Sequence, residues 1–373
     1  MKLFRNIPAL LLLMTCITVL TPSCKVGRFV VYNVADIRDY KKFPHHDLHR
    51  PATTFYFQQS EQGKAPKSVT DETTGRTVSF DQYLEESHTV AFLVIQHDTI
   101  QYEKYFDGYD QSSIVPSFSM AKSFTSILIG CAIDDGLIGS VQDSITQYIP
   151  ELSKHGFGQV TIEHLLQMTS GLKFNEGYYN PFGQVATFYY GTHLRRAIRH
   201  LKLKRAPGTQ FEYVSGGTQL LGLVLERALK GKTITEYMEE KLWQPLGMQY
   251  DASWSTDRKK EGLEKTFCCV NATAIDFAKI GRLYLHKGNW DGRQIVPEEW
   301  VSQSTKVDSS GGSAWYYQYQ WWLPTPTGDF LANGYLGQYV YVNPAKDLII
   351  VRLGKKPGRV EWDTVFVSLA ENY

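Results

Sequence analysis

The spacing of hydrophobic residues differs between the two ends of the chain and its middle. An unbroken apolar run at 90–95 predicts a buried strand, and the Tyr- and Phe-containing segment 100–106 returns from a short turn, which is typical of a β-hairpin. From Ser119 onward, apolar residues recur every three or four positions, which predicts a helix that ends near Gly136. The pattern therefore changes from strand to helix close to Ser119.

Helical spacing continues through the middle of the chain, and strand patterns return near its end. Helices are predicted at 161–169, 216–230, 233–242, 272–287 and 297–304, then strands at 315–323, 330–335, 338–342 and 348–353, and a last helix at 362–370. This order indicates an α+β fold in which both ends of the chain build one antiparallel sheet, flanked by helices, with a helical subdomain inserted between them. We expect the sheet part at about 68–118 and 313–373 and the helical part at about 119–312, with an active site where they meet.

The first residues have the pattern of an export signal. Lys2 and Arg5 flank the start of an apolar run over 7–20, which is too short for a membrane-spanning helix, and Ser23-Cys24 follows it. A small residue before a cysteine is typical of a bacterial lipoprotein signal, so we predict that 1–23 is a signal peptide and that Cys24 is lipidated. The alternative is an ordinary secretory signal that ends near a cysteine.

This N-terminus predicts a location and a domain organisation. We expect a protein of a bacterial cell envelope, lipid-anchored on the periplasmic or outer-membrane side, whose membrane contact is made through the lipid. Residues 24–67 are mixed and polar and are predicted to form a tether or N-terminal arm, ahead of the main domain at 68–373.

Composition and charge exclude several classes of function. The chain has 373 residues, of which 43% are hydrophobic, as in globular proteins. Its 39 basic and 38 acidic residues give a formal charge of +1, which predicts no nucleic-acid partner. The cluster His45-His46-Asp47-x-His49 has no second group of ligands, so we interpret it as a solvated polar stretch, and we expect no metal and no cofactor.

Three cysteines follow Cys24 in the chain. Cys131 ends an apolar run and is predicted to be a buried thiol. Cys268 and Cys269 are adjacent, and adjacent cysteines rarely bridge because the geometry is strained, so no disulfide is predicted.

The strongest chemical signal is Ser119-Met-Ala-Lys122, at the start of the first predicted helix. Residues three apart share a helix face, so the Ser119 hydroxyl lies one turn from an amine. Serine is a weak nucleophile without a base, and burial that lowers the pKa of Lys122 would make the lysine such a base. The helix N-terminus also favours negative charge beside Ser119. Taken alone, the motif also fits a solvated lysine beside a capping serine.

Two later segments supply complementary groups. Tyr213-Val-Ser215-Gly-Gly precedes a predicted helix and places a phenol at a loop tip, where it transfers protons if a nearby ammonium lowers its pKa. Asn333-Gly334-Tyr335 lies between two late strands, and a glycine there allows a strand edge to approach a ligand closely. The N–H of Tyr335 is then expected to join that of Ser119 in an oxyanion hole. The alternatives are a tyrosine that only packs and a plain hairpin turn.

In this order, and at separations of about 90 and 120 residues, the three segments resemble the motifs of the serine β-lactamase and penicillin-binding-protein superfamily. Over about 80–373 the chain is most similar to the class C β-lactamase-related esterases and amidases, including 6-aminohexanoate-dimer hydrolases. Further matching segments are 160–172, 245–248, 272–281 and 337–344. The resemblance implies a β-lactamase/transpeptidase-like fold, with Ser119 as the acylated nucleophile, Lys122 as its base or proton relay and Tyr213 as a second proton-transfer group.

The chain departs from the β-lactamase pattern at two places. Ala332-Asn333-Gly334 stands where β-lactamases usually have Lys, Thr and Gly, whose cation and hydroxyl hold the antibiotic's carboxylate, and Ser215 replaces a common Asn. By their places in the motifs, Ser215, Asn333, Gly334 and Tyr335 are the expected substrate-binding residues. Arg352 or Lys355 would be the alternative source of a cation, and Tyr335, Tyr339, Trp321 and Trp322 are expected to contribute an aromatic cleft wall.

These features predict a serine hydrolase that acts through an acyl-enzyme on small carboxylic esters or linear amides. The alternatives are a D,D-peptidase or β-lactamase that acts on cell-wall peptides or β-lactams, and a non-catalytic penicillin-recognising binding protein. The complete set of Ser119, Lys122 and Tyr213 favours an enzyme over a binding protein.

Overall fold

The computed structural model describes residues 25–32, 35–64, 66, 68–70, 75–356, 358 and 360–373. The predicted signal peptide and the predicted lipidation residue Cys24 lie outside these ranges. Within them, no helix combines the length and the apolar character needed to cross a lipid bilayer.

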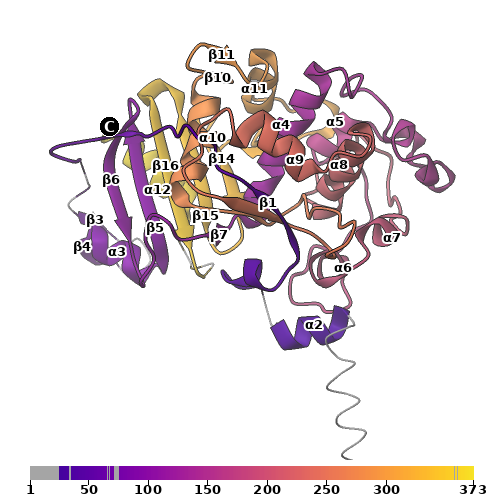
Figure 1. Cartoon of the computed structure of the whole chain (residues 1–373), viewed down its shortest axis with the longest axis horizontal. Helices are drawn as coiled ribbons and strands as arrows, with labels where there is room; N and C mark the ends of the chain where they lie inside the picture. The colour runs from indigo at the N-terminus through magenta and orange to yellow at the C-terminus, as the bar shows by residue number, and fades with distance from the viewer. Residues whose placement is uncertain are drawn as a thin grey trace, which may run out of the picture.

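Both ends of the described chain contribute to the main sheet, which confirms the predicted α+β architecture (Figure 1). The strands lie in the order β12, β13, β14, β15, β16, β5, β6 and β2, and all neighbours are antiparallel except β6 and β2. Their bounds are β2 (Gln58–Gln59), β5 (Thr89–Gln96), β6 (Thr99–Tyr105), β12 (Tyr317–Gln318), β13 (Trp321–Trp322), β14 (Phe330–Gly334), β15 (Gln338–Asn343) and β16 (Leu348–Gly354).

Helices cover both faces of this sheet, which explains why β5 and β16 are apolar almost throughout. On one face, α3 (Phe80–Glu86) and α12 (Trp362–Ala370) pack aromatic side chains such as Phe366 against Phe92 and Tyr341. On the other face, α10 (Ala274–Leu285) lies so close that a Cβ on its Gly281 would be 2.9 Å from Ile349 Cγ2.

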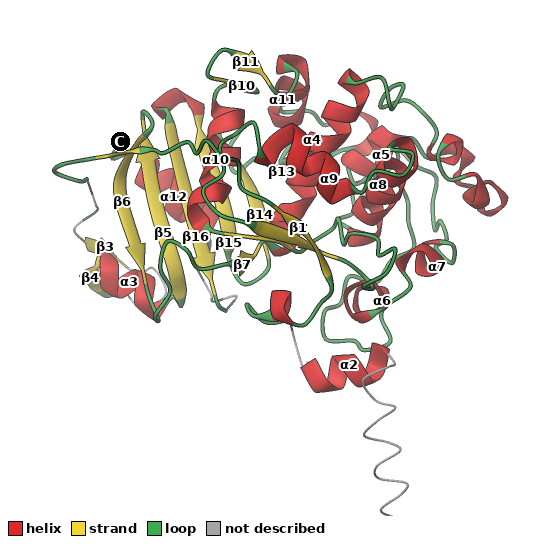
Figure 2. Ribbon diagram, in the orientation of Figure 1, coloured by secondary structure: helices red, strands yellow, loops and turns green. Residues whose placement is uncertain are grey.

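Most other helices form the part drawn at the right of Figure 2, with α11 at the top of the picture. They are α4 (Ala121–Asp134), α5 (Ile162–Leu166), α6 (Gln184–Tyr190), α7 (Leu194–Ile198), α8 (Ser215–Ala228), α9 (Ile234–Met238) and α11 (Glu298–Thr305). Helix α8 packs against α4 and α5. The predicted helix 161–169 and the predicted strand 315–323 are both interrupted by a turn of the backbone. Met168, beyond the end of α5, has φ 57°. Tyr319 and Gln320, between β12 and β13, have φ 38° and 70°.

A second sheet, which the sequence patterns do not predict, joins the two parts. Its order is β1 (His45–Leu48), β8 (Ala252–Ser255), β9 (Val270–Ala272) and β7 (Val115–Pro116). Strand β7 leads directly into the segment that carries Ser119, so this sheet positions the Ser119 segment beside β9.

The described part of the predicted N-terminal arm belongs to the fold. Phe43 and Leu48 are buried, and β1 pairs with β8 along its whole length. His46 Nδ1 lies 2.9 Å from Glu264 Oε1, so this histidine has a structural partner. No group of three or more potential metal ligands is found among the described residues. Helix α2 (Lys25–Tyr32) packs on α6, where the rings of Phe29 and Tyr190 meet edge to face at 5.3 Å.

Candidate active site

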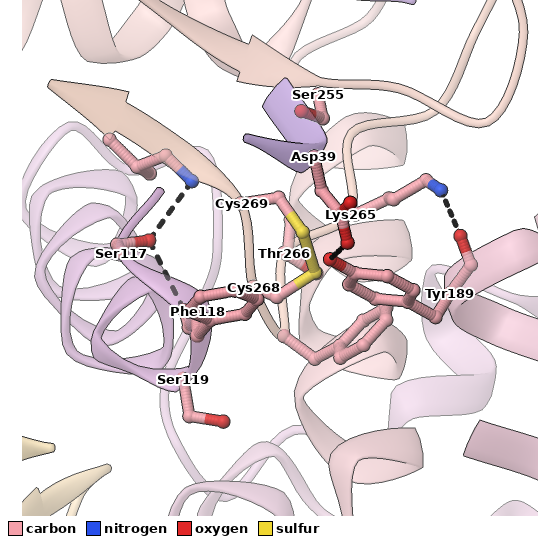
Figure 3. Close-up of a disulfide and its surroundings, with 12 residues drawn as sticks. Asp39, Ser117, Phe118, Ser119, Tyr189, Ser255, Lys265, Thr266, Cys268 and Cys269 are labelled. Carbon is pink, nitrogen blue, oxygen red and sulfur yellow. Dashed lines mark hydrogen bonds between the residues drawn. A yellow bond between two sulfur atoms is a disulfide. The ribbon is translucent and has the colours of Figure 1, made fainter. Parts of the chain in front are cut away.

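Ser119 lies in a short 3₁₀ turn, Phe118–Met120, between β7 and α4. Phe118 has φ 45°, a backbone region that residues other than glycine rarely adopt and that costs roughly 1–3 kcal/mol. The turn is held from β9, because the Ser117 N–H donates to the Val270 carbonyl at 2.7 Å and Ser117 Oγ accepts from the Val270 N–H at 3.0 Å. Figure 3 shows Ser117, Phe118 and Ser119 along this segment. A strained, firmly held turn thus presents the half-buried Ser119 hydroxyl.

Lys122 is buried, and its amine has three polar neighbours. Its Nζ lies 3.0 Å from Ser119 Oγ, 3.1 Å from Ser215 Oγ and 2.9 Å from the Phe267 carbonyl oxygen. Burial lowers the pKa of Lys122 to about 8, although the negative charge of Glu176 acts in the opposite direction. The condition that the motif needs, a lysine with a lowered pKa beside Ser119, is therefore met.

The partners of Lys122 determine where its lone pair points. The Phe267 carbonyl can only accept a hydrogen bond, and Ser215 Oγ donates its own proton to Glu176 Oε1, so both must accept N–H groups from Lys122. A neutral amine has two N–H groups, which these two acceptors use. The lone pair is then left for the Ser119 hydroxyl, as a general base requires.

Glu176 completes this arrangement and was not found from the sequence. Its Oε2 accepts the backbone N–H of Ser215 at 2.8 Å, which places a carboxylate at the N-terminus of the 14-residue helix α8, where the helix dipole favours negative charge. A signal was present, because Glu176 is the only acidic residue between Glu163 and Glu212, in a stretch rich in Lys and Arg.

Two tyrosine hydroxyls approach Ser119. The ring of Tyr213 lies with its centroid 4.9 Å from Lys122 Nζ, and its hydroxyl interacts with the Ser119 side chain. Burial raises the pKa of Tyr213 well above its usual value, so the lowering that the sequence analysis required is absent and the group is a neutral phenol. Tyr178 was missed from the sequence; its hydroxyl also interacts with Ser119, and its ring stacks on Tyr335 at 5.1 Å.

The predicted oxyanion segment lies beside the segment that carries Ser119. A Cβ on Gly334 would be 2.2 Å from the Ser117 carbonyl oxygen, so only glycine lets β14 approach this closely. Ser119 and Tyr335, whose N–H groups are the predicted oxyanion donors, line the same cleft.

Arg352 and Lys355 do not supply a cation to this cleft. Arg352 is fully buried behind the β14–β15 turn, where Nη1 donates to the Gly337 carbonyl at 2.7 Å and Nη2 to the Ser87 carbonyl at 2.8 Å. Lys355 forms an ion pair with Asp107. Neither residue therefore replaces the missing β-lactamase lysine, because each is engaged with partners of its own.

Two pockets meet at the site, and Ser119, Tyr178 and Tyr335 line both of them. The wide cleft, of about 280 Å³, is also lined by Tyr213, Trp322, Asn333, Gly334, Leu336, Gly337 and Tyr339. The narrow pocket, of about 40 Å³, is also lined by Ala35, Phe118, Tyr179, Val185, Ala186, Tyr189, Tyr190, Ser215, Phe267 and Cys268. Neither set of lining residues contains a charged side chain.

The aromatic wall is mostly where it was predicted, with one correction. Tyr335, Tyr339 and Trp322 line the wide cleft, but Trp321 is fully buried and packs on Tyr284 with ring centroids 4.4 Å apart. Trp321 and Trp322 are neighbours on a strand and so face opposite sides of the sheet.

The cysteines also require a correction. Cys268 and Cys269 form a disulfide in the loop that leads into β9, so the prediction of no disulfide is wrong. Cys269 has φ 74°, and this unusual turn brings the two neighbouring side chains to the same side. Cys131 is a buried free thiol, as predicted.

The comparisons with known proteins agree with this fold and site. Residues 79–365 match the beta-lactamase family model, so the chain belongs to the beta-lactamase family, a family of serine hydrolases. It is 29% identical over 303 residues to the 6-aminohexanoate-dimer hydrolase of Paenarthrobacter ureafaciens, covering 76% of each chain.

Solved structures share the fold. A Bacillus anthracis structure described provisionally as a 6-aminohexanoate-dimer hydrolase has a TM-score of 0.80 at 23% identity, with 95% of this chain and 97% of that chain covered. A family VIII carboxylesterase has a TM-score of 0.61 at 16% identity, with 78% of this chain and 94% of that chain covered.

The charge of Glu176 should tune the base. Because that charge raises the pKa of Lys122, Glu176→Gln should lower it, and the reactive neutral amine should persist to lower pH. We expect the rate at which a fluorophosphonate labels Ser119 to rise with pH through about 8 in the wild type, and this rise to move to lower pH in Glu176→Gln. Labelling rates between about pH 6 and pH 10 give the midpoint of this rise for each protein.

Glu226→Gln is the matched control, since Glu226 lies near the other end of α8 and pairs with Arg195. Its pH profile should equal that of the wild type. A profile of Glu176→Gln that is unchanged, or that moves to higher pH, would contradict the assigned influence of this carboxylate.

Proposed function

We propose that the protein is a serine hydrolase that forms an acyl-enzyme on Ser119 and cleaves short, uncharged carboxylic esters or linear amides. The observation that carries this proposal is the distance of 3.0 Å between Lys122 Nζ and Ser119 Oγ, with both N–H groups of the neutral amine bound to fixed acceptors. The names of the similar proteins, a 6-aminohexanoate-dimer hydrolase and a carboxylesterase, support the same class of reaction.

Acylation starts from the neutral form of Lys122. A pKa of about 8 leaves roughly one amine in ten neutral at pH 7, against about one in three thousand at the usual 10.5. The Ser119 proton moves to Lys122 Nζ while Ser119 Oγ bonds to the substrate's carbonyl carbon. The carbonyl oxygen takes the negative charge next to the N–H groups of Ser119 and Tyr335. The new ammonium is stabilised by the Phe267 carbonyl, by Ser215 and by the charge of Glu176.

Proton transfer to the leaving group is the role of Tyr213. Its high pKa keeps Tyr213 protonated, so it is a proton donor and not a resident phenolate, and it lines the cleft that Ser119 also lines. Tyr213 therefore passes a proton to the departing oxygen or nitrogen and regains one from the Lys122 ammonium. Lys122 is neutral again, and it accepts the proton of the water that hydrolyses the Ser119 ester and releases the acid.

The position of Tyr213 also orients the substrate. Tyr213 lines the wide cleft and not the narrow pocket, so the leaving group that it protonates occupies the wide cleft. The acyl group then points into the narrow pocket. The narrow pocket, of about 40 Å³, is much smaller than the wide cleft of about 280 Å³, and its apolar lining favours a short aliphatic chain.

Labelling of Ser119 tests the central assignment. A fluorophosphonate should attach to Ser119 alone, and Ser119→Ala should abolish both labelling and turnover, as read by intact mass and peptide mapping.

Lys122→Ala and Tyr213→Phe should each lower kcat by roughly 10²–10⁴, because each removes a proton-transfer group. Ser126→Ala is the control: it changes a buried serine on α4 outside the site and should keep both labelling and turnover. An adduct on another residue, or near-wild-type kinetics of Lys122→Ala, would refute the mechanism.

Acyl length and charge test the substrate class. We expect kcat/KM for p-nitrophenyl acetate and butyrate to exceed that for the octanoate and for nitrocefin by tenfold or more (about 1.4 kcal/mol). The octanoate is too long for the narrow pocket, and a β-lactam carboxylate finds no cation among the residues that line either pocket.

A wider pocket should change this preference. Val185→Ala should raise relative activity on longer esters, whereas Val224→Ala, a buried change on α8 away from the pocket, should leave the ratio unchanged. Nitrocefin turnover tenfold above that of the short esters would instead support a β-lactamase, and binding of β-lactams without turnover of any substrate would support a binding protein.

We also propose that Cys24 carries a lipid that holds the protein at a bacterial envelope membrane. The basic n-region, the apolar run over 7–20 and Ser23-Cys24 support this. Helix α2 begins directly after Cys24 and packs on α6. Because α6 carries Tyr189 and Tyr190 of the narrow pocket, an anchor at Cys24 would keep the site near the membrane surface.

The wild type should fractionate with membranes and Cys24→Ala should not. Membrane retention of Cys24→Ala, or a native N-terminus at another residue, would contradict the proposal.

A further inference from the structure

The Cys268–Cys269 disulfide lies directly beside the catalytic machinery. Both residues are buried, and Cys268 lines the narrow pocket that also contains Ser119. Figure 3 shows the bridge between the segment of Ser117 and Ser119 on one side and Lys265 with Tyr189 on the other. This place in the fold is not explained by a need to hold distant parts of the chain together, because the two cysteines are sequence neighbours.

The bond fixes the local backbone instead. It closes a small ring that contains the peptide bond between the two residues, which restricts the torsions of both. Cys269 has φ 74°, a conformation from which a free cysteine would tend to relax. The ring is also tied to β8, since the Trp254 indole donates to the Cys268 carbonyl at 3.0 Å and the Ser255 N–H to the Cys269 carbonyl at 3.0 Å.

The residues on either side of this ring hold the two reacting groups. Before it, the Phe267 carbonyl accepts a hydrogen bond from Lys122 Nζ at 2.9 Å. After it, Val270 exchanges two hydrogen bonds with Ser117, two positions before Ser119. A rotation of the peptide between Phe267 and Cys268 would take the Phe267 carbonyl away from the Lys122 amine. The Lys122 N–H group that now donates to this carbonyl would lose its acceptor. The lone pair of Lys122 would then no longer be directed at Ser119.

We propose that the Cys268–Cys269 disulfide is a positioning element that aligns Lys122 with Ser119, so that activity depends on the oxidation state of this pair. The proposal rests on the proposed function, in which Lys122 is the base. Reduction by a dithiol transfers two electrons and two protons to the bridge: the S–S bond breaks, two thiols form, and the dithiol becomes a disulfide. The enzyme is active in the oxidised form and slower in the reduced form.

The main test compares the purified wild type with Cys268→Ser/Cys269→Ser on p-nitrophenyl acetate. Loss of alignment should lower kcat by roughly tenfold to a hundredfold while KM changes less than twofold, because the pockets remain. The looser site should admit water, which should return the pKa of Lys122 upward toward its usual value. The acid limb of the kcat/KM profile should therefore move to higher pH, and activity should partly recover at that higher pH. A purely structural bridge would affect stability without moving this limb.

Controls separate the pair from other thiols and from loss of fold. Cys131→Ser changes the buried free thiol of α4 and should keep both kcat and the pH profile. The loss of wild-type activity in dithiothreitol should be proportional to the fraction of Cys268–Cys269 that peptide mapping shows to be reduced. Dithiothreitol should leave the activity of the double variant unchanged. Cys268→Ala/Cys269→Ala serves as a second variant, and circular dichroism checks that each is folded.

The outcomes are distinct. Wild-type kcat and pH profile in a folded double variant would overturn the proposal, and so would alkylation of both cysteines in the wild type as purified. Unfolding of both double variants would also overturn it, since the bridge would then be a requirement of the fold. If Ser119→Ala remained active, the proposed function itself would fail, whereas an inactive Ser119→Ala together with unaffected cysteine variants would reject only the role of the disulfide.

Discussion

The site depends on one physical constraint, the burial of an amine among acceptors that consume its protons. Lys122 is removed from water, which disfavours its charged form, and it is surrounded by a carbonyl and by a serine whose own proton is given to Glu176. In this environment the neutral amine has one free direction, toward Ser119. Much of the surrounding structure can be understood as the means of keeping these few atoms in place.

Several parts of the fold converge on that constraint. The small sheet brings β7 and β9 together and so fixes the turn before Ser119, while α8 places Ser215 at its N-terminus next to Glu176. The loop before β9 is held between helices, because Thr125 of α4 donates to the Thr266 carbonyl at 2.9 Å and Thr266 donates to the Thr218 carbonyl of α8 at 3.0 Å. The Phe267 carbonyl lies in this loop, and thus the position of one acceptor depends on two helices and a sheet.

Features that follow from helix and strand geometry or from the family motifs were predicted from the sequence, and features that arise only in the folded chain were missed. The one-turn spacing of Ser119 and Lys122 and the need for glycine at position 334 follow from helix and strand geometry, and the structure brings these residues together with Tyr213 and Ser215. Glu176 acts on Ser215 across 39 positions, and the strands of the small sheet have two to four residues, so no periodic pattern reveals either. The disulfide was missed because a general argument about strain does not anticipate the particular turn at Cys269.

The protonation state of Lys122 is the most direct test of this account. Nuclear magnetic resonance of protein labelled with ¹³C at the lysine side chains gives a titration for each amine, and the Lys122→Arg variant identifies the signal of Lys122 among other buried lysines such as Lys265 and Lys279. The account predicts a midpoint near the pKa of about 8 and a signal that depends on the charge of Glu176. A midpoint at or above the ordinary lysine value of 10.5 would show that the amine is charged at working pH, and would contradict its role as the base that activates Ser119.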